Sequence, residues 1–317
     1  MHGNGREIVR IENIVKDFRP GFGLRTKRVL HGISLGVNDG EIFGFVGPNG
    51  AGKTTTLKVL MGLIRATSGE ATILGHSVNE TAFRREIGFL PENPYFYSHL
   101  TGREILGFFA KLSGVSRGRR KQRIGELLEW VGLDHAADSR LGTYSKGMLQ
   151  RLGIAQALVH DPRVVFLDEP MSGLDPIGRV EIRDLVLRLR SEGKTVFMNT
   201  HILHDVEMLC DRVAIIADGR IRYQGVIEDL VGSGLNEVDI VVANLPSEMA
   251  LELEDRPTVE LRGVGDRVEI RVAEKEVNDT LRCVLGAGGE VVGVTRHRVS
   301  LESFFLSTVE AGTEAGE

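Results

Sequence analysis

The sequence predicts an α/β fold with a largely parallel sheet, followed by a small α+β module. Short apolar runs alternate with helical patterns over residues 1–235, which is typical of strands linked by helices. One run, Ile42–Val46, is continuously apolar, as in a strand that is covered on both faces. The charge changes after Gly232-Ser233-Gly234, and we therefore expect a domain boundary there.

The individual elements follow from periodicity. Ile33, Leu35 and Val37 alternate as in a half-buried strand, which Asn38-Asp39-Gly40 ends. A helix whose apolar face has the spacing i, i+3, i+4 and i+7 is expected to include Leu57, Leu60, Met61 and Ile64. Asp218-Gly219 predicts a tight hairpin. Three further buried strands are predicted at Val164–Leu167, Thr195–Met198 and Val213–Ile216.

Two regions differ from this alternating pattern. Residues 100–141 are predicted to be helical, and their basic cluster around Arg117–Arg123 is interpreted as a solvated helix start. Residues 236–317 hold 17 acidic and 8 basic residues, a net charge of −9, against +4 for the rest of a chain whose net charge is −5. Strands are expected at Val238–Val242, Val268–Val272 and Glu290–Val294. Two apolar helix faces are expected, one from Val277, Leu281, Val284 and Leu285, the other from Leu301, Phe304 and Phe305 after a cap at Ser300.

Composition excludes several classes of protein. The net charge of −5 over 317 residues is not that of a strongly basic nucleic-acid binder. Cys210 and Cys283 are too few for a disulfide framework and are expected to be reduced and buried. Neither a signal peptide nor an apolar run long enough to span a membrane is found, so a cytoplasmic location is expected.

The strongest motif is a phosphate loop at residues 47–54. Its glycines let the backbone turn so that N–H groups converge on phosphate, and the following helix directs its positive end there. Lys53 can reach the β- and γ-phosphates, the Thr54 hydroxyl can bind Mg²⁺, and Thr55 can contact an inner phosphate. The predicted nucleotide contacts are Gly47, Pro48, Asn49, Gly50, Ala51, Gly52, Lys53, Thr54 and Thr55.

A second motif places two carboxylates after a buried strand. Asp168 ends the run that starts at Val164, and Glu169 follows it. Asp168 is suited to hold Mg²⁺ through its water shell, and Glu169 to orient or deprotonate an attacking water. Alone this pair is a weak signal, because acidic residues are common at strand ends. The phosphate loop makes it persuasive.

Two further features are uninformative on their own. Ser145-Lys146-Gly147-Met148 is a polar turn before a helix, and an ordinary helix start explains it equally well. His201 follows a predicted strand, and a single histidine is more often structural than catalytic. Their order and spacing relative to the two motifs above make a functional role worth considering for both.

Together these motifs resemble the ATP-binding cassette family, specifically the ATPase subunit of an ABC transporter. The resemblance implies a P-loop ABC ATPase domain over residues 6–235, with a helical subdomain at about 95–155 and a small acidic α+β extension at 236–317. It matches 47–54 to Walker A, 164–168 to Walker B, Glu169 to the catalytic carboxylate and His201 to the switch histidine. Ser145 and Gly147 fall in the signature loop, and 172–175 in the loop that crosses the dimer interface. Phe18 lies where the family often stacks an aromatic on adenine, although Phe22 competes and a core role is equally natural.

The chain departs from the family pattern in two places. The signature loop carries Lys146 and Met148 in place of glycine and glutamine, and Glu92 stands where a glutamine is usual. A carboxylate at Glu92 can approach Mg²⁺ but brings negative charge towards phosphate. Both departures resemble a subgroup that serves exporters of drugs, ions or polysaccharides. That subgroup tends to end in a stretch like Ser300–Phe305.

The resemblance implies ATP and Mg²⁺ as ligands, a homodimer that closes over two ATP molecules, and separate membrane permease subunits as partners. Each ATP would lie between the phosphate loop of one copy and Ser145–Gly147 of the other. The permease would be contacted through 95–141 and Glu92, which places the chain on the inner face of the membrane. No nucleic-acid partner is expected. The alternatives are a soluble ABC ATPase acting on ribosomes or DNA, and a nucleotide-binding regulator with little hydrolysis.

Overall fold

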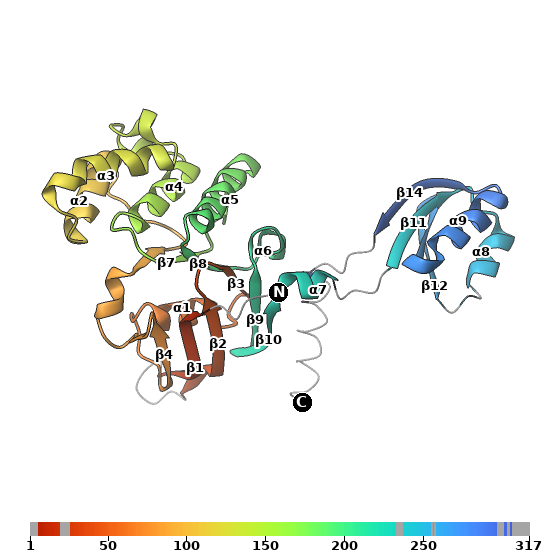
Figure 1. Ribbon diagram of the computed structural model, residues 1–317, viewed down its shortest axis with the longest axis horizontal. Coiled ribbons are helices and arrows are strands. Elements are labelled where there is room, and N and C mark those ends of the chain that lie inside the picture. Colours follow the sequence, from red (N-terminus) through yellow and green to blue (C-terminus); the bar gives the residue numbers. More distant parts are fainter. Residues whose placement is uncertain are drawn as a thin grey trace. The chain divides into compact units, whose positions relative to one another are not determined.

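This computed structural model describes residues 6–19, 26–232, 237–254, 256, 258–296, 301–302 and 305. Contacts divide the described chain into two compact units: the first comprises the residues up to Ile227 together with Phe305, and the second begins at Glu228. Figure 1 shows the elements of both. The domain boundary expected after residue 235 stays a prediction. Each unit is described by itself.

The first unit is built on a six-stranded sheet with the order β10-β9-β3-β8-β7-β6. The pairs β9–β3, β3–β8, β8–β7 and β7–β6 are parallel, whereas the hairpin pair β9–β10 is antiparallel around Asp218-Gly219, so the predicted α/β class and hairpin are confirmed. Phe43, Phe45 and Phe166 all pack against Phe197 in the core, with ring centroids 5.5–5.7 Å apart. The bounds are β3 Ile42–Val46, β6 Ile87–Leu90, β7 Val164–Asp168, β8 Thr195–Thr200, β9 Arg212–Ala217 and β10 Arg220–Val226.

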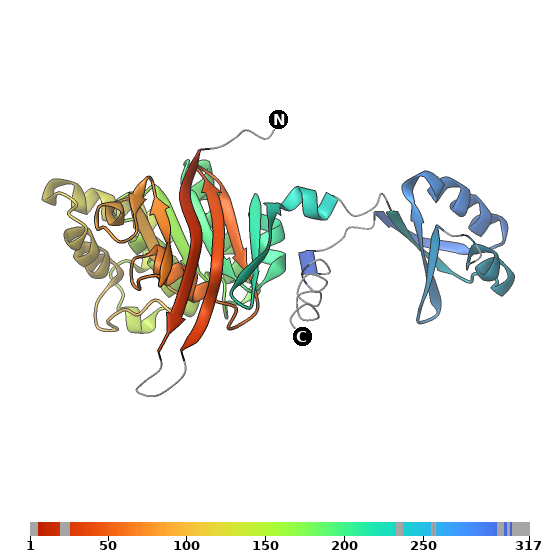
Figure 2. The same ribbon diagram turned by 90° about the horizontal axis from the view of Figure 1, so that it is seen from below.

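A second, antiparallel sheet of the first unit has the order β2-β1-β4-β5. Figure 2 shows its two long strands, β1 and β2, side by side. The alternation at Ile33, Leu35 and Val37 correctly predicted part of β2, and all three side chains are buried. The bounds are β1 Glu7–Phe18, β2 Lys27–Asn38, β4 Ser68–Ile73 and β5 His76–Ser77.

Helix α1 (Lys53–Leu60) follows the phosphate loop directly, but it is shorter than its apolar spacing predicts. Met61 caps it, and Gly62 has a left-handed φ of +63°, at which a Cβ would lie 2.7 Å from the Val78 carbonyl oxygen. The chain therefore leaves the helix before Ile64. Ile64 still packs against the core, so its apolar character reflects tertiary packing and not a helix face.

Helices α2 (Gly102–Leu112), α3 (Arg117–Trp130) and α4 (Lys146–Ala157) contact one another and lie close together in Figure 1. Thr101 and Glu104 form a capping box at the start of α2. The basic cluster is the start of α3, as expected, with Arg117, Arg119 and Lys121 exposed. Two more helices of this unit are α5 (Pro176–Ser191) and α6 (Leu203–Leu209).

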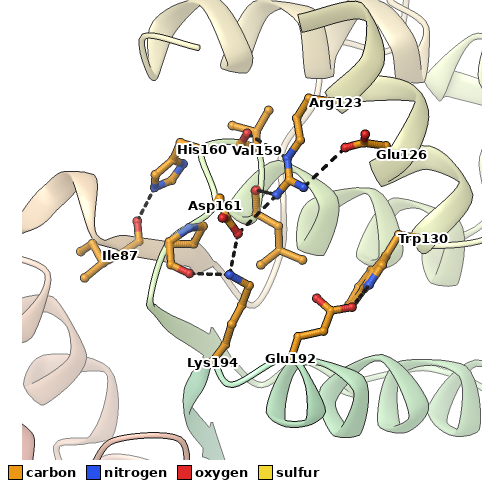
Figure 3. A network of polar contacts seen from close by, with 11 residues as sticks. Ile87, Arg123, Glu126, Trp130, Val159, His160, Asp161, Glu192 and Lys194 are labelled. Atoms are coloured by element: carbon orange, nitrogen blue, oxygen red, sulfur yellow. Dashed lines mark hydrogen bonds and ion pairs between the residues drawn. The ribbon is translucent and has the colours of Figure 1, made fainter. Parts of the chain in front are cut away.

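Polar contacts join α3 to the segment between α4 and β7 and to the residue that follows α5 (Figure 3). Arg123 donates to the Leu158 carbonyl at 2.7 Å, beyond the carboxyl end of α4, and approaches Asp161 at 3.7 Å. Lys194 Nζ pairs with the same Asp161 at 2.7 Å. Trp130 Nε1 donates to Glu192, the residue that caps α5, at 2.7 Å. Contacts from the middle and the carboxyl end of α3 thus bind the helical group to the segments that precede β7 and β8.

The second unit has a four-stranded antiparallel sheet with the order β12-β13-β11-β14, and its chain order is β-α-β-β-α-β. The three strands expected in the tail are confirmed as parts of β11, β13 and β14, while β12 and α8 were not predicted. Val238, Ile240, Val242, Ile270 and Val272 belong to its core. The bounds are α7 Ile227–Gly232, β11 Glu237–Ala243, α8 Ser247–Glu254, β12 Val259–Val264, β13 Arg267–Ala273, α9 Val277–Gly286 and β14 Glu290–Arg296.

Three expectations for the tail need correction or fall outside the description. Leu285 is 59% exposed at the end of α9, so only Val277, Leu281 and Val284 of that set pack on the core. Cys283 is half-buried, unlike the buried Cys210, and both thiols are free. Leu301 is buried, whereas Ser300 and Phe304 lie outside the described residues. Among the residues that the structure describes, none of the helices has the length and hydropathy to span a membrane.

Candidate functional site

A cleft of about 390 Å³ brings together most of the predicted site. Its residues come from the phosphate loop, the start of α1, the segment after β6 and the turns after β7 and β8. Ligands of open parallel sheets bind at this place, outside the carboxyl ends of the strands. The lining residues are Val29, Asn49, Gly50, Gly52, Lys53, Thr54, Thr55, Glu92, Glu169 and His201.

The phosphate loop needs glycine at particular points. A Cβ at Gly47 would lie 2.2 Å from the Ile216 carbonyl oxygen, so no other residue fits between β3 and β9. Gly50 and Gly52 have φ values of +84° and +109°, which favour glycine. Space around Gly50 is open, because nothing lies within 4 Å of where its Cβ would be. The loop thus leaves a cradle beside the first N–H groups of α1.

Lys53 is a buried cation at the first position of α1, 6% exposed. Its Nζ donates to the carbonyls of Gly47 at 2.7 Å and Pro48 at 3.3 Å. Burial lowers the pKa of this amine, and the carboxylates of Glu169, Asp168 and Glu92 oppose that shift. The loop carbonyls therefore hold the ammonium group in the cleft.

Asp168 and Glu169 are placed by the pairing of β7 with β8. Asp168 lies opposite Asn199, whose side-chain amide donates to Asp168 Oδ1. Burial raises the pKa of Asp168 against the effect of this bond, and Glu169 and Glu92 raise it further. Glu169 has a left-handed φ of +48°, which is strained for a non-glycine residue, and its N–H donates to the Asn199 carbonyl at 2.8 Å. This backbone turn directs the chain away from β7 at the cleft.

His201 and Glu169 are direct partners. His201 Nδ1 lies 2.8 Å from Glu169 Oε2, and the Thr200 hydroxyl donates to the same oxygen at 3.4 Å. The Glu169 side chain is 10% exposed and that of His201 is 48% exposed. Two partners thus bind the same oxygen, Oε2, and orient the carboxylate of Glu169.

Seven predicted site residues are not among the cleft's lining residues: Phe18, Gly47, Pro48, Ala51, Ser145, Gly147 and Asp168. Ser145 caps α4, its Oγ accepting from the Met148 N–H at 3.2 Å, and Gly147 lies in the first turn of that helix. Phe18 ends β1, is 39% exposed, and has Lys16 Nζ 5.0 Å from its ring centroid. The nucleotide contacts expected of Ser145, Gly147 and Phe18 therefore stay predictions.

Two residues at or next to the site, Val29 and Asn199, were not predicted from the sequence. Val29 lines the cleft from β2, and no local pattern pointed to it. Asn199 stands two residues before His201 at the end of a predicted apolar strand, and a polar residue in that place was the available signal.

Comparison with known proteins decides the family. The family described as ABC transporter matches residues 30–172. An ABC transporter ATP-binding protein of Nostoc sp. is 41% identical over 310 residues, which cover 97% of this chain and 91% of that protein. The chain belongs to the ATP-binding subunits of ABC transporters.

Two further matches bear on this ABC ATP-binding subunit. The bacitracin transport ATP-binding protein BcrA of Bacillus licheniformis is 37% identical over 292 residues, covering 90% of this chain and 94% of that one. An ATP-binding cassette solved as a dimer in a post-hydrolysis state with ADP and Pi has a TM-score of 0.63 and 27% identity, covering 69% of this chain and 98% of that one. Membership of the family makes ATP the nucleotide and ATP hydrolysis the chemistry of this subunit.

Proposed function

We propose that this ABC subunit hydrolyses ATP to drive the export of a substrate through separate membrane subunits. The observation that carries the proposal is the cleft in which Lys53, Glu92, Glu169 and His201 surround the phosphate loop. A regulator that only binds nucleotide would have no need of an oriented carboxylate there. Two of the relatives reported above carry ABC transporter or transport in their names, which supports transport over action on ribosomes or DNA.

Each residue of the cleft has a role in this proposal. Lys53 and the N–H groups of residues 49–55 bind the phosphates, and the space around Gly50 admits them. Glu169 orients or deprotonates the attacking water, a contribution that is typically about 10²–10⁴-fold in rate. His201 holds Glu169 Oε2 at 2.8 Å and contacts the γ-phosphate.

The donor set also suits Mg²⁺. Among the described residues no three or more His, Cys, Asp or Glu side chains form a metal cluster. Mg²⁺ needs none, since it usually binds through one or two carboxylates, substrate phosphates and waters. Thr54, Asp168 and Glu92 would hold it, and when bound it neutralises developing phosphate charge. An unpartnered buried oxygen on Asn199, next to Asp168, also fits an ion with its waters.

A second copy of the chain completes the site. Ser145 and Gly147 are at the start of α4 and do not line the cleft of their own chain. They would contact the γ-phosphate held by the phosphate loop of the other copy. The dimeric cassette reported above supports such an arrangement. Hydrolysis then removes the bridging phosphate and lets the two copies separate.

Membrane subunits would dock on an apolar groove beside the helical group. It has a volume of about 470 Å³, and its lining residues include Leu63, Phe89, Pro94, Tyr95 and Phe109. Leu63 is 62% exposed and Tyr95 is 89% exposed, which is unusual for large apolar side chains. Glu92 lies in the segment between this groove and the cleft, so docking there can affect the ATP site. The subunit would then sit on the inner face of the membrane.

The transported substrate is proposed at the level of its class. The relative named for bacitracin transport matches over nearly its whole length. This supports an exporter of drug-like compounds, in agreement with the subgroup that Glu92 and Lys146 resemble.

The test is affinity purification of the tagged full-length chain from gently solubilised cells, with phosphate release measured on the same preparation. A stoichiometric multi-span membrane protein together with ATP hydrolysis is expected. Ribosomes or DNA-bound proteins in its place would overturn the transport proposal. Leu63→Glu should lose the membrane protein, because it places a charge in the groove. Met208→Glu, a change at a 54% exposed apolar residue on α6, is the matched control and should retain it.

A further inference from the structure

Asn199 is a fully buried polar residue, 0% exposed, that is bonded to the side chain of Asp168 and to the backbone of Glu169. Its side-chain amide nitrogen donates to Asp168 Oδ1, and its backbone carbonyl accepts the N–H of Glu169 at 2.8 Å. These bonds follow from the parallel register of β7 and β8, which sets Asn199 opposite Asp168. One residue of β8 therefore fixes the side chain at the end of β7 and the backbone of the next residue.

The oxygen of this side-chain amide, unlike its nitrogen, is not bonded within the described residues. Asn199 Oδ1 is buried and has no hydrogen-bond partner there. A buried acceptor without a donor costs about 1–3 kcal/mol, and nearly all such groups in folded proteins have a partner. Every other residue of β8 is also buried, so an apolar side chain would have avoided this cost. The oxygen therefore lacks a donor among the described residues, and a water is a donor small enough to supply the bond.

The chemistry of the cleft limits what that donor is. Phosphate oxygens and the carboxylates of Asp168 and Glu169 are acceptors and have no proton to give when ionised. Lys53 Nζ is already directed to the carbonyls of Gly47 and Pro48. Water bound to a divalent cation is a good donor, because the cation polarises its O–H bonds.

We propose that Asn199 is a positioning residue for the divalent cation that accompanies ATP. This inference rests on the proposed function. The amide nitrogen holds Asp168 in one rotamer, and Oδ1 accepts a hydrogen bond from a water of the cation's shell. Asn199 touches neither nucleotide nor attacking water, so its effect passes through the cation. Partners of this outer kind typically change metal affinity by about 10–100-fold when they are mutated.

The test is Mg²⁺ titration of nucleotide binding to the full-length protein, with a fluorescent ATP analogue as the probe. Asn199→Leu keeps the shape of the side chain and removes both polar atoms. We expect its half-saturating Mg²⁺ concentration to rise about 10-fold or more. Binding of the same analogue in EDTA should change less than about twofold, because the phosphate loop is untouched.

The matched control is Thr195→Val at the other end of the same strand. Thr195 is also 0% exposed, and its Oγ1 accepts from the Gly40 N–H at 2.7 Å. The control also removes a side-chain hydrogen bond of β8, but at the first residue of the strand and not beside Asp168. We expect its Mg²⁺ midpoint to match that of the parent, which separates a specific effect from general loss of stability.

Several outcomes would overturn the inference alone. An unchanged Mg²⁺ midpoint in Asn199→Leu would do so, as would an equal shift in Thr195→Val or an equal loss of binding in EDTA. If Asn199→Leu does not fold, Asn199→Ser replaces it, and a midpoint equal to that of the parent again rejects the role. A parent protein that binds the analogue without any effect of Mg²⁺ would instead overturn the proposed magnesium site, and with it this inference.

Discussion

The cleft and the loop before α4 are two halves of one proposed site, yet they are built differently. Lys53 and Glu169, which line the cleft, are buried, as is the neighbouring Asp168, and each is bonded to backbone or side-chain partners. Ser145 is exposed, and its hydroxyl serves only its own helix. In the proposed function, the difference means that a single chain pre-arranges the groups that bind and cleave ATP. The groups proposed to contact a second copy stay accessible to it.

Glu169→Gln tests the proposed role of the cleft in ATP hydrolysis, and the largest effect is expected from it. We expect ATP hydrolysis to fall about 10²–10⁴-fold, because the amide cannot take a proton from water. ATP binding should remain, and an ATP-bound dimer should accumulate. Phosphate release and sedimentation of the full-length protein with ATP measure the two effects. Normal turnover would remove Glu169 from its role and make the cleft's arrangement a structural one.

Lys53→Ala tests the binding half of the cleft. Loss of a charge-assisted bond to phosphate, about 1.5–3 kcal/mol, should weaken ATP affinity about 10- to 150-fold. Lys58→Ala on the same helix is the control, since Lys58 is exposed and does not line the cleft. Isothermal titration calorimetry compares the two variants. Equal affinities in both would contradict the phosphate-loop assignment.

Ser145→Ala tests whether the loop before α4 acts only in the dimer. The affinity of the single chain for ATP should be unchanged, whereas the ATP-dependent dimer and hydrolysis should fall about tenfold for one lost hydrogen bond. The variant also loses a helix cap, worth about 1 kcal/mol. Thr101→Ala, which removes the cap of α2, is matched for that loss. If both variants form the ATP-dependent dimer equally well, Ser145 has no role in the dimer beyond capping α4.

Asp168→Asn tests how far the buried charge of Asp168 lowers the stability of the folded chain. Of the predicted changes, this one is expected to be the smallest. Burial raises the pKa of Asp168 in the folded chain, so the folded chain takes up a proton at a higher pH than the unfolded chain does. The ionised carboxylate thus lowers stability at neutral pH, and this penalty fades as the pH falls through the raised pKa. The variant should melt about 2–4 °C higher at pH 7, and the gap should close towards acidic pH. Thermal melts followed by circular dichroism would contradict this if the gap were independent of pH.

The sequence predicted correctly those elements whose structure depends on neighbouring residues in the chain. The apolar run at 42–46 could only be a doubly covered strand, and the glycine spacing at 47–52 serves a turn whose positive φ values other residues disfavour. Asp218-Gly219 specified its hairpin in the same way. Periodicity misled where packing overrides it, as at Ile64, which is apolar because it touches the core and lies beyond the end of α1.

The sequence by itself predicted a nucleotide site, because Lys53, the pair Asp168 and Glu169, and His201 each stand at or just after the end of a predicted strand. Only the tertiary structure decided how they meet. His201 reaches Glu169, and Asn199 joins Asp168 to Glu169, because β7 and β8 are parallel neighbours in one register. That register pairs residues 31 positions apart, and it arises from packing of the whole sheet, which no local pattern in the chain encodes.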